Sequence, residues 1–301
     1  MTTILSFLFV IGVLVFVHEL GHYLAARSVG VRVEKFYLGF NFFGLGIHKT
    51  YKGTEYGLGL FPFGGYVKLA GAIDESMDIS STGAHDELRS KNALEKIWVM
   101  SAGVIMNFLL AIIIFSLSHL SIGEKIISKE AIVSGVVPTL PADSIGIVEN
   151  DKILSIDGNK FNSKDAWNKM STYISSNPGK DVEIIWESNG FKKQSRIIID
   201  SYSDIVDYEF TNIGRIGIFP ITTTSEIDLF RAFKLGFETT KFWFDKTLGS
   251  FICLIKGTVP LSGLGGPIMI AKVSGQASEI GFGALLNLMA ILSINLGIIN
   301  I

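Results

Sequence analysis

The residues of this sequence best suited to chemistry are His18-Glu19-Leu20-Gly21-His22. Side chains four residues apart share one face of a helix, so the two imidazoles can grip a tetrahedral zinc ion while Glu19 reaches the water bound to it. The motif lies inside the apolar segment 4–26, where ionisable groups are costly unless a partner compensates them. A metal ion is such a partner. The pattern therefore predicts a zinc hydrolase site inside a membrane, with His18 and His22 as ligands.

The composition is typical of an integral membrane protein. Apolar residues make up 48% and charged residues 18% of the 301 residues, and the mean hydropathy is +0.43. The formal net charge of −2 gives no reason to expect nucleic-acid binding. The single cysteine, Cys253, excludes an internal disulfide and a cysteine-rich metal site.

Three segments are long enough to cross a bilayer, which takes about 20 apolar residues. They are residues 4–26, 97–120 and 280–301. A signal peptide is the alternative for the first, but no Lys or Arg precedes Arg27 and no cleavage-site pattern follows. Basic residues crowd the facing ends of the first two spans: Arg27, Arg32, Lys35, Arg89, Lys91 and Lys96. We therefore expect a cytoplasmic loop between these spans and an extracytoplasmic segment after the second.

The loop of residues 29–96 contains a predicted β-hairpin. Apolar residues alternate with Gly in 44–47 and 56–60, and residues 52–54 form a turn. The next segment, 61–67, is unusually apolar, so we expect this region to lean into the bilayer beside the metal; a Gly-rich surface loop is the alternative. An exposed strand edge here could pair with an unwound substrate, and we assign Gly57, Leu58 and Gly59 to substrate binding.

After the second span, residues 121–201 are predicted to form a soluble α+β domain. The segments 134–138, 141–142 and 150–158 resemble a PDZ domain of the permuted bacterial protease kind, and a generic small β-domain is the alternative. We expect a linker at 202–229. Residues 230–257 have the two-faced pattern of an amphipathic helix lying in the membrane interface, with a fourth span as the alternative, and 258–279 connect to the last span.

Taken together, the chain resembles the site-2 protease family of intramembrane zinc metalloproteases, and more narrowly the bacterial regulator-of-sigma-E protease type. The resemblance rests on the His-Glu-x-x-His motif, the PDZ-like insertion and these further segments: Gly64-Gly65-Tyr66-Val67, Ser101-Ala102-Gly103 with Asn107, Gly266-Pro267-Ile268 and Asn295-Leu296-Gly297-Ile298-Ile299-Asn300. It implies a polytopic α-helical membrane protein with a membrane-leaning β-hairpin loop and one inserted PDZ-like domain. Family members with tandem PDZ domains have a longer insertion.

The family's site is implied residue by residue. His18, His22 and an Asp would hold Zn²⁺, and Glu19 would take a proton from the bound water and deliver it to the leaving amine. The motif that carries this Asp begins at Asn300, so we expect the Asp after Ile301 and expect residues 1–301 alone to bind zinc poorly and to be inactive. Asn300 itself matches a family position that contacts the substrate or the oxyanion.

The implied activity is cleavage of single-span membrane proteins inside the lipid bilayer, in regulated intramembrane proteolysis of an anti-sigma factor or a signal-peptide remnant. The expected location is the bacterial inner (cytoplasmic) membrane, with the PDZ-like domain outside the cytoplasm as a size gate or a binder of new carboxyl ends. Two alternatives stay open. A membrane metal transporter would need ionisable residues in several spans, and a non-catalytic membrane adaptor presenting the PDZ-like domain would need no zinc.

Overall fold

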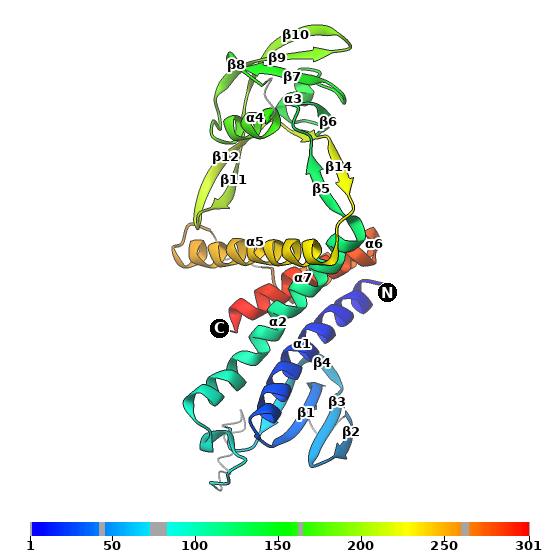
Figure 1. Ribbon diagram of the computed structural model, residues 1–301, viewed down its shortest axis with the longest axis vertical. Helices are drawn as coiled ribbons and strands as arrows, with labels where there is room; N and C mark the ends of the chain where they lie inside the picture. Colours follow the sequence, from blue (N-terminus) through cyan, green and yellow to red (C-terminus); the bar gives the residue numbers. More distant parts are fainter. Residues whose placement is uncertain (1, 42–45, 73–82, 162–164, 260–264, 301) are drawn as a thin grey trace. The chain divides into compact units, whose positions relative to one another are not determined.

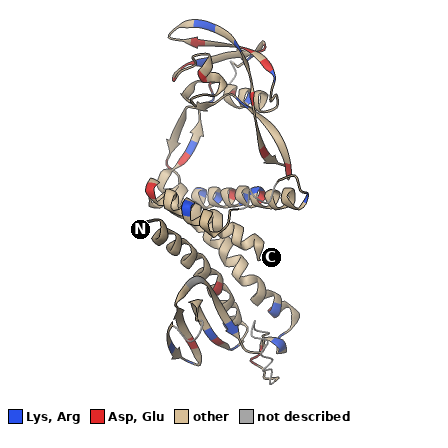
Figure 2. Cartoon of the chain, turned by 180° about the vertical axis from the view of Figure 1, so that it is seen from behind, with Lys and Arg blue, Asp and Glu red and all other residues tan. Residues whose placement is uncertain are grey.

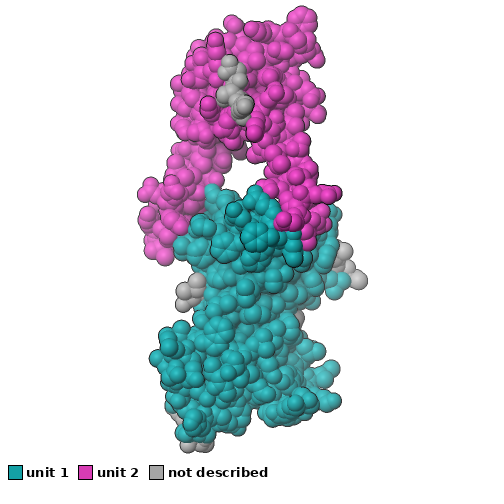
Figure 3. Space-filling model, in the orientation of Figure 1, with its two compact units in different colours: residues 1–119, 229–248, 261–301 teal, residues 120–228, 249–260 magenta. Residues whose placement is uncertain are grey.

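The structure is a computed structural model that describes residues 2–41, 46–72, 83–161, 165–259 and 265–300. The chain divides into two compact units (Figure 3). Unit 1 comprises residues 1–119, 229–248 and 261–301, and unit 2 comprises residues 120–228 and 249–260.

Three helices are long and apolar enough to cross a membrane, judged by length and composition. They are α1 (Thr2–Ser28), α2 (Ala93–Ile122) and α7 (Phe282–Ile299), and they correspond to the three predicted spans. Figure 2 shows these helices almost without charged residues. A reciprocal cap starts α2, because Asn92 and Glu95 each accept the other's backbone N–H at 2.9 Å.

A further helix, α6 (Pro267–Ile280), occupies the segment that we expected to be only a connection, so that expectation was wrong. Its sequence signal is Pro267 at the first helical position after Gly266. Helix α6 packs closely on α1, since a Cβ added at Gly275 would lie 2.5 Å from the Thr3 hydroxyl oxygen. Residues from α1, α2, α6 and α7 share one apolar core, which includes Val10, Ala111, Ala277 and Ile294.

Unit 1 also contains a four-stranded sheet, in the order β2-β3-β1-β4, shown beside α1 in Figure 1. Its strands are β1 (Val33–Phe40), β2 (Gly46–Tyr51), β3 (Thr54–Gly59) and β4 (Phe61–Leu69). Strands β2 and β3 pair antiparallel around Lys52 and Gly53, whose φ values of 48° and 81° suit a tight hairpin turn. The start of the predicted hairpin, at residues 44–45, lies outside the described residues, and its lean into the bilayer stays a prediction.

The sheet corrects our placement of a substrate-pairing edge at Gly57, Leu58 and Gly59. These residues belong to β3, which has β2 on one side and β1 on the other, so its backbone groups are already engaged. The two glycines have a packing role: a Cβ at Gly57 would overlap the Tyr37 ring, and one at Gly59 would overlap the backbone of Phe40. The Leu58 side chain is 58% exposed, but the edges of this sheet are β2 and β4.

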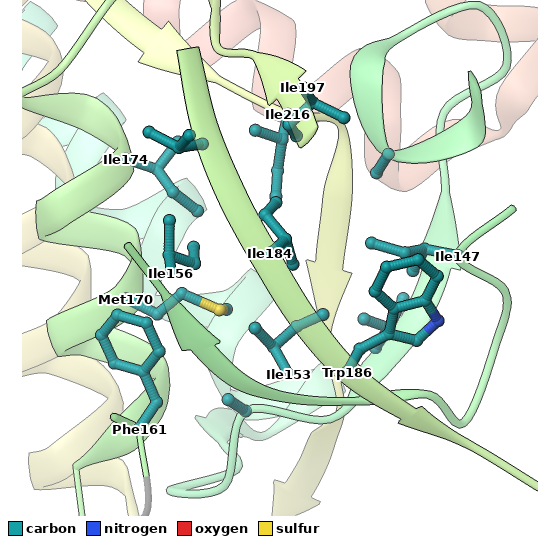
Figure 4. Packing of buried hydrophobic residues seen from close by; sticks show 14 of the residues in the cluster. Ile147, Ile153, Ile156, Phe161, Met170, Ile174, Ile184, Trp186, Ile197 and Ile216 are labelled. Atoms are coloured by element: carbon teal, nitrogen blue, oxygen red, sulfur yellow. The ribbon is translucent and has the colours of Figure 1, made fainter. Parts of the chain in front are cut away.

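Unit 2 is built on a second four-stranded sheet, in the order β10-β9-β7-β8. These strands are β7 (Lys152–Ile156), β8 (Asn159–Lys160), β9 (Asp181–Ser188) and β10 (Phe191–Ile198), accompanied by the helices α3 (Pro141–Ser144) and α4 (Ala166–Ser175). Alternate residues of β9, Val182, Ile184 and Trp186, enter one hydrophobic core together with Met170 of α4. In Figure 4, Trp186 lies beside Ile147 and Met170 lies beside Phe161. The domain itself was predicted from the segments 134–138, 141–142 and 150–158, which contribute β6 (Val133–Val136), α3 and β7.

The linker expected at 202–229 was wrong, because strands of unit 2 occupy most of it. Strands β11 (Asp200–Val206) and β12 (Glu209–Arg215) form a hairpin. Strand β13 (Ile218–Pro220) pairs with β6 (Val133–Val136), and β14 (Thr222–Ser225) pairs with β5 (Glu124–Ile127). Several of these strands are largely solvent-exposed, so they lack the apolar alternation that identifies a half-buried strand.

The predicted amphipathic helix corresponds to α5 (Leu229–Ile255). Its exposed phenylalanines include Phe230, Phe233 and Phe237, and Lys241 and Asp245 form an ion pair one turn apart at 2.6 Å. Its position in the membrane interface stays a prediction.

Candidate functional site

The His-Glu-x-x-His motif lies in α1, on one face as its spacing requires. The imidazole rings of His18 and His22 have centroids 4.9 Å apart, and their Nε2 atoms are 3.3 Å apart. Two nitrogens bound to one tetrahedral zinc ion at 2.0–2.1 Å are about 3.3 Å apart. The two histidines therefore present their ring nitrogens at the separation that zinc needs.

Helix α2 supplies the surface behind the histidines. Val99, Gly103 and Asn107 follow one another at intervals of four residues and so line one face of α2. The Val99 carbonyl oxygen lies 2.8 Å from His22 Nδ1, and the Asn107 amide Nδ2 lies 3.1 Å from His18 Nδ1. A carbonyl can only accept, so His22 carries its proton on Nδ1 and keeps the Nε2 lone pair free.

Gly103 of α2 lies against the Nε2 atoms of both histidines. A Cβ added there would lie 2.5 Å from His22 Nε2 and 2.8 Å from His18 Nε2. Any other residue would occupy the space into which both nitrogens point. The glycine thus leaves a cradle between the two imidazoles, and the donor set of two imidazoles with an adjacent carboxylate suits a zinc hydrolase.

Glu19 is held from a different element, the edge strand β4. The backbone N–H of Val67 hydrogen-bonds the Glu19 carboxylate. The close approach of strand and helix depends on Gly65, where a Cβ would lie 2.8 Å from Val15 Cγ1 and 3.1 Å from Glu19 Cγ. The general base predicted from the sequence is therefore oriented by the backbone of a strand.

Among the described residues, the structure brings together two of the expected metal ligands, His18 and His22. Within that described part of the chain, no group of three or more His, Cys, Asp or Glu side chains is arranged to hold a metal ion. Asn300 is the C-terminal cap of α7, with its N–H donated to the Leu296 carbonyl at 3.2 Å. Its role in substrate binding, and the Asp expected as third ligand, stay predictions.

Sequence reasoning named Gly103 and Asn107 only as parts of a resemblance and assigned them no role. A usable signal was present, since Asn107 is the single amide side chain of α2 and lies four residues from a glycine. A polar residue inside an apolar span requires a hydrogen-bonding partner. The contributions of Val99 and Val67 come from their backbones, which no side-chain pattern reveals.

Comparisons with known proteins identify the family of the chain. The sequence profile of Peptidase family M50 matches residues 6–301. A "Putative zinc metalloprotease" of Clostridium perfringens is 34% identical over 291 residues, covering 96% of this chain and 79% of the relative. A second one, of Campylobacter jejuni, is 31% identical and covers 99% of this chain and 78% of the relative. The "Probable protease eep" of Enterococcus faecalis is 28% identical over 382 residues, covering 100% of this chain and 86% of the relative.

Among solved structures, the PDZ domain of an SdrC-like protein from Listeria monocytogenes is similar to part of the chain. It is 25% identical and covers 32% of this chain and 92% of that domain, with a TM-score of 0.25. The family match extends over nearly the whole chain and includes the His18-Glu19-His22 turn. The chain belongs to peptidase family M50, the site-2 protease family of metalloproteases.

Proposed function

We propose that this protein is an intramembrane zinc metalloprotease that hydrolyses peptide bonds within the transmembrane segments of single-span membrane proteins. One observation carries the proposal: the His18-Glu19-His22 turn lies in the apolar helix α1 and faces Gly103 of the apolar helix α2. Both helices are long enough to cross the bilayer, so a substrate at this site would be a polypeptide at membrane depth.

His18 and His22 would hold the zinc ion through their Nε2 atoms, with a third ligand expected from the Asp that the family resemblance implies. When bound, zinc supplies a Lewis acid that polarises the scissile carbonyl and lowers the pKa of a bound water toward about 7. Glu19 would act as the general base: its carboxylate would accept a proton from the attacking water and would later donate it to the leaving amine. The Val67 N–H holds the carboxylate in place during both transfers.

A substrate helix must unwind before cleavage, because its carbonyls are bonded inside the helix. An edge strand can replace the lost hydrogen bonds by adding the unwound segment to a sheet. Of the two edges, β4 is the one that contacts Glu19, through Val67. We therefore assign substrate pairing to β4, which replaces the assignment to Gly57, Leu58 and Gly59.

For unit 2, we propose that it acts as a gate that excludes proteins with bulky domains. A second role has its own support, a groove of about 450 Å³ between α4 and β13, lined by residues that include Met170, Ile174, Gly217 and Phe219. In the described part of the chain, β13 has β6 as its single strand partner, so its other edge is open to an extended peptide. A new carboxyl end is the peptide that we expect there.

The basic residues between the first two spans support a cytoplasmic sheet and an extracytoplasmic unit 2 in a bacterial inner membrane. This arrangement fits regulated proteolysis of an anti-sigma factor or removal of a signal-peptide remnant.

The substitution Glu19→Gln tests the proposed chemistry. The full-length variant should keep its zinc content, because Glu19 is not a ligand, while cleavage of a model membrane helix falls by about 10²-fold or more. Glu34→Gln makes the same chemical change in β1, away from the site, and should leave both measurements unchanged. Full activity of Glu19→Gln, or a zinc-free wild-type protein that still cleaves, would overturn the proposal.

A further inference from the structure

The side chain of Asn107 occupies a position that the family assignment does not explain. It is completely buried, at 0% exposure, in the middle of α2. Its amide Nδ2 faces His18 Nδ1 at 3.1 Å, whereas its Oδ1 is buried without a hydrogen-bond partner. A buried amide oxygen without a donor is rare and indicates that a partner or another orientation completes the arrangement.

The two amide atoms are nearly equal in size, so interchanging them alters the hydrogen bonding without altering the packing. With Nδ2 toward the ring, His18 Nδ1 must accept, and the proton of the neutral imidazole lies on Nε2. That proton would be donated to His22 Nε2, 3.3 Å away, and would fill the space between the histidines. With Oδ1 toward the ring, His18 Nδ1–H donates, and the Nε2 lone pair is free.

The environment of His18 favours the second arrangement once a cation is bound. His22 already has its proton on Nδ1, where the Val99 carbonyl accepts it. The backbone carbonyl of Gly103 is a further acceptor for an N–H of the His18 ring. If both Nε2 atoms are unprotonated, their lone pairs lie 3.3 Å apart, and a cation between them removes the repulsion.

A residue of helix α7 hydrogen-bonds the backbone of Asn107. The hydroxyl of Ser293, itself fully buried, donates to the Asn107 carbonyl oxygen at 2.8 Å. This bond fixes the backbone of Asn107 relative to α7. The side-chain amide can then change its orientation only by rotation about its own χ angles.

From these contacts we propose that Asn107 is the positioning residue of His18: its Oδ1 accepts from Nδ1–H and so fixes the tautomer whose Nε2 binds zinc. The inference rests on the proposed zinc site. Asn107 does for His18 what the Val99 carbonyl does for His22, and the two acceptors lie on one face of α2, eight residues apart.

Two variants of the purified full-length protein test this role. Asn107→Leu keeps the approximate volume but removes the acceptor, and should weaken zinc binding by about 10- to 100-fold, measured by competition with a chromophoric chelator. In Asn107→Asp, either carboxylate oxygen can accept from His18 Nδ1–H, so this variant should bind zinc close to the wild-type level. The matched control is Asn287→Leu in α7, whose amide donates to Ser118 at 3.4 Å and should not affect zinc affinity.

The absorption spectrum of the Co²⁺-substituted protein gives a second measurement, which should change in Asn107→Leu and stay near wild type in Asn107→Asp. Wild-type affinity and spectrum in Asn107→Leu would overturn the inference, as would equal losses in the Leu and Asp variants. If Asn107→Leu does not fold, the ¹⁵N shift of His18 Nδ1 in the zinc-bound wild type decides, because an unprotonated Nδ1 contradicts the proposal. A wild type that binds no zinc would instead refute the proposed function itself.

Discussion

The backbone N–H of Val67 in β4 donates a hydrogen bond to the carboxylate of Glu19 in α1. The proposed general base is thereby attached to the strand that we propose pairs with substrate, while the two histidines are attached to α2. Metal binding and base orientation consequently depend on different elements, and substitutions can separate them.

Gly103→Ala should abolish metal binding. The new Cβ would lie 2.5 Å from His22 Nε2 and 2.8 Å from His18 Nε2, in the space where both nitrogens point. Zinc affinity, measured by chelator competition, should fall by at least the roughly 100-fold seen for residues behind metal ligands. Gly12→Ala in α1 is the control, because a Cβ there meets nothing within 4 Å. Stoichiometric zinc in Gly103→Ala would show that the histidines are not the ligands.

Gly65→Ala should reduce cleavage without removing zinc. Its Cβ would lie 2.8 Å from the Tyr37 backbone oxygen of β1, 2.8 Å from Val15 Cγ1 and 3.1 Å from Glu19 Cγ, so β4 must shift relative to both β1 and α1. Displacement of a catalytic group by about 1 Å can cost 10²-fold in rate. We expect a loss of that order in turnover of a membrane-helix substrate, with wild-type zinc content. An unchanged rate would contradict the role of β4 in orienting the base.

Removal of residues 125–224, which make up most of unit 2, should admit substrates with intact bulky domains. Glu124 and Ser225 are paired residues of β5 and β14, so the chain leaves and returns at adjacent positions and residues 125–224 can be excised. The trimmed protein should cleave both full and truncated substrates. Loss of all cleavage in a stable, zinc-loaded protein would favour a role in substrate recruitment.

A shorter deletion within the same region is the control for this experiment. Deleting only 125–200 would leave β13 and β14 without their partners β6 and β5, so this shorter deletion should be unstable to proteolysis.

Acid should weaken unit 2 through Asp157. Hydrogen bonds from Lys180, at 2.8 Å, and from the Glu183 N–H hold the pKa of Asp157 down at about 2. A carboxylate whose folded pKa is depressed stabilises the fold above its unfolded pKa of about 3.9, and this contribution is lost as the pH falls toward 2. Asp157→Asn should therefore destabilise unit 2 at pH 7, and the difference from wild type should shrink between about pH 4 and pH 2.

Amide hydrogen exchange in β9, corrected for its intrinsic pH dependence, measures this effect in the full chain. Lys180→Met should remove most of the pH-dependent difference, because Lys180 is the largest cause of the shift. A difference between wild type and Asp157→Asn that is the same at pH 7 and pH 2 would contradict the assignment.

The sequence by itself determined the chemistry and the spans. The spacing of His18, Glu19 and His22 is a property of a single helix turn, and the apolar stretches of α1, α2 and α7 are local as well. Such features are readable because 3.6-residue periodicity and membrane length depend on nearby residues alone. The segments 134–138, 141–142 and 150–158 predicted the domain in unit 2 for the same reason, because each is a local strand or turn pattern.

Tertiary structure decided which residues surround that chemistry. Strands β1 and β4, the return of β13 and β14 to β6 and β5, and the packing of α6 on α1 all join segments far apart in the chain. The contacts of His22 with Val99 and of His18 with Asn107 span 77 and 89 residues. Backbone acceptors and missing Cβ atoms leave no side-chain pattern, so only the folded chain shows that α2 holds the histidines and β4 holds the base.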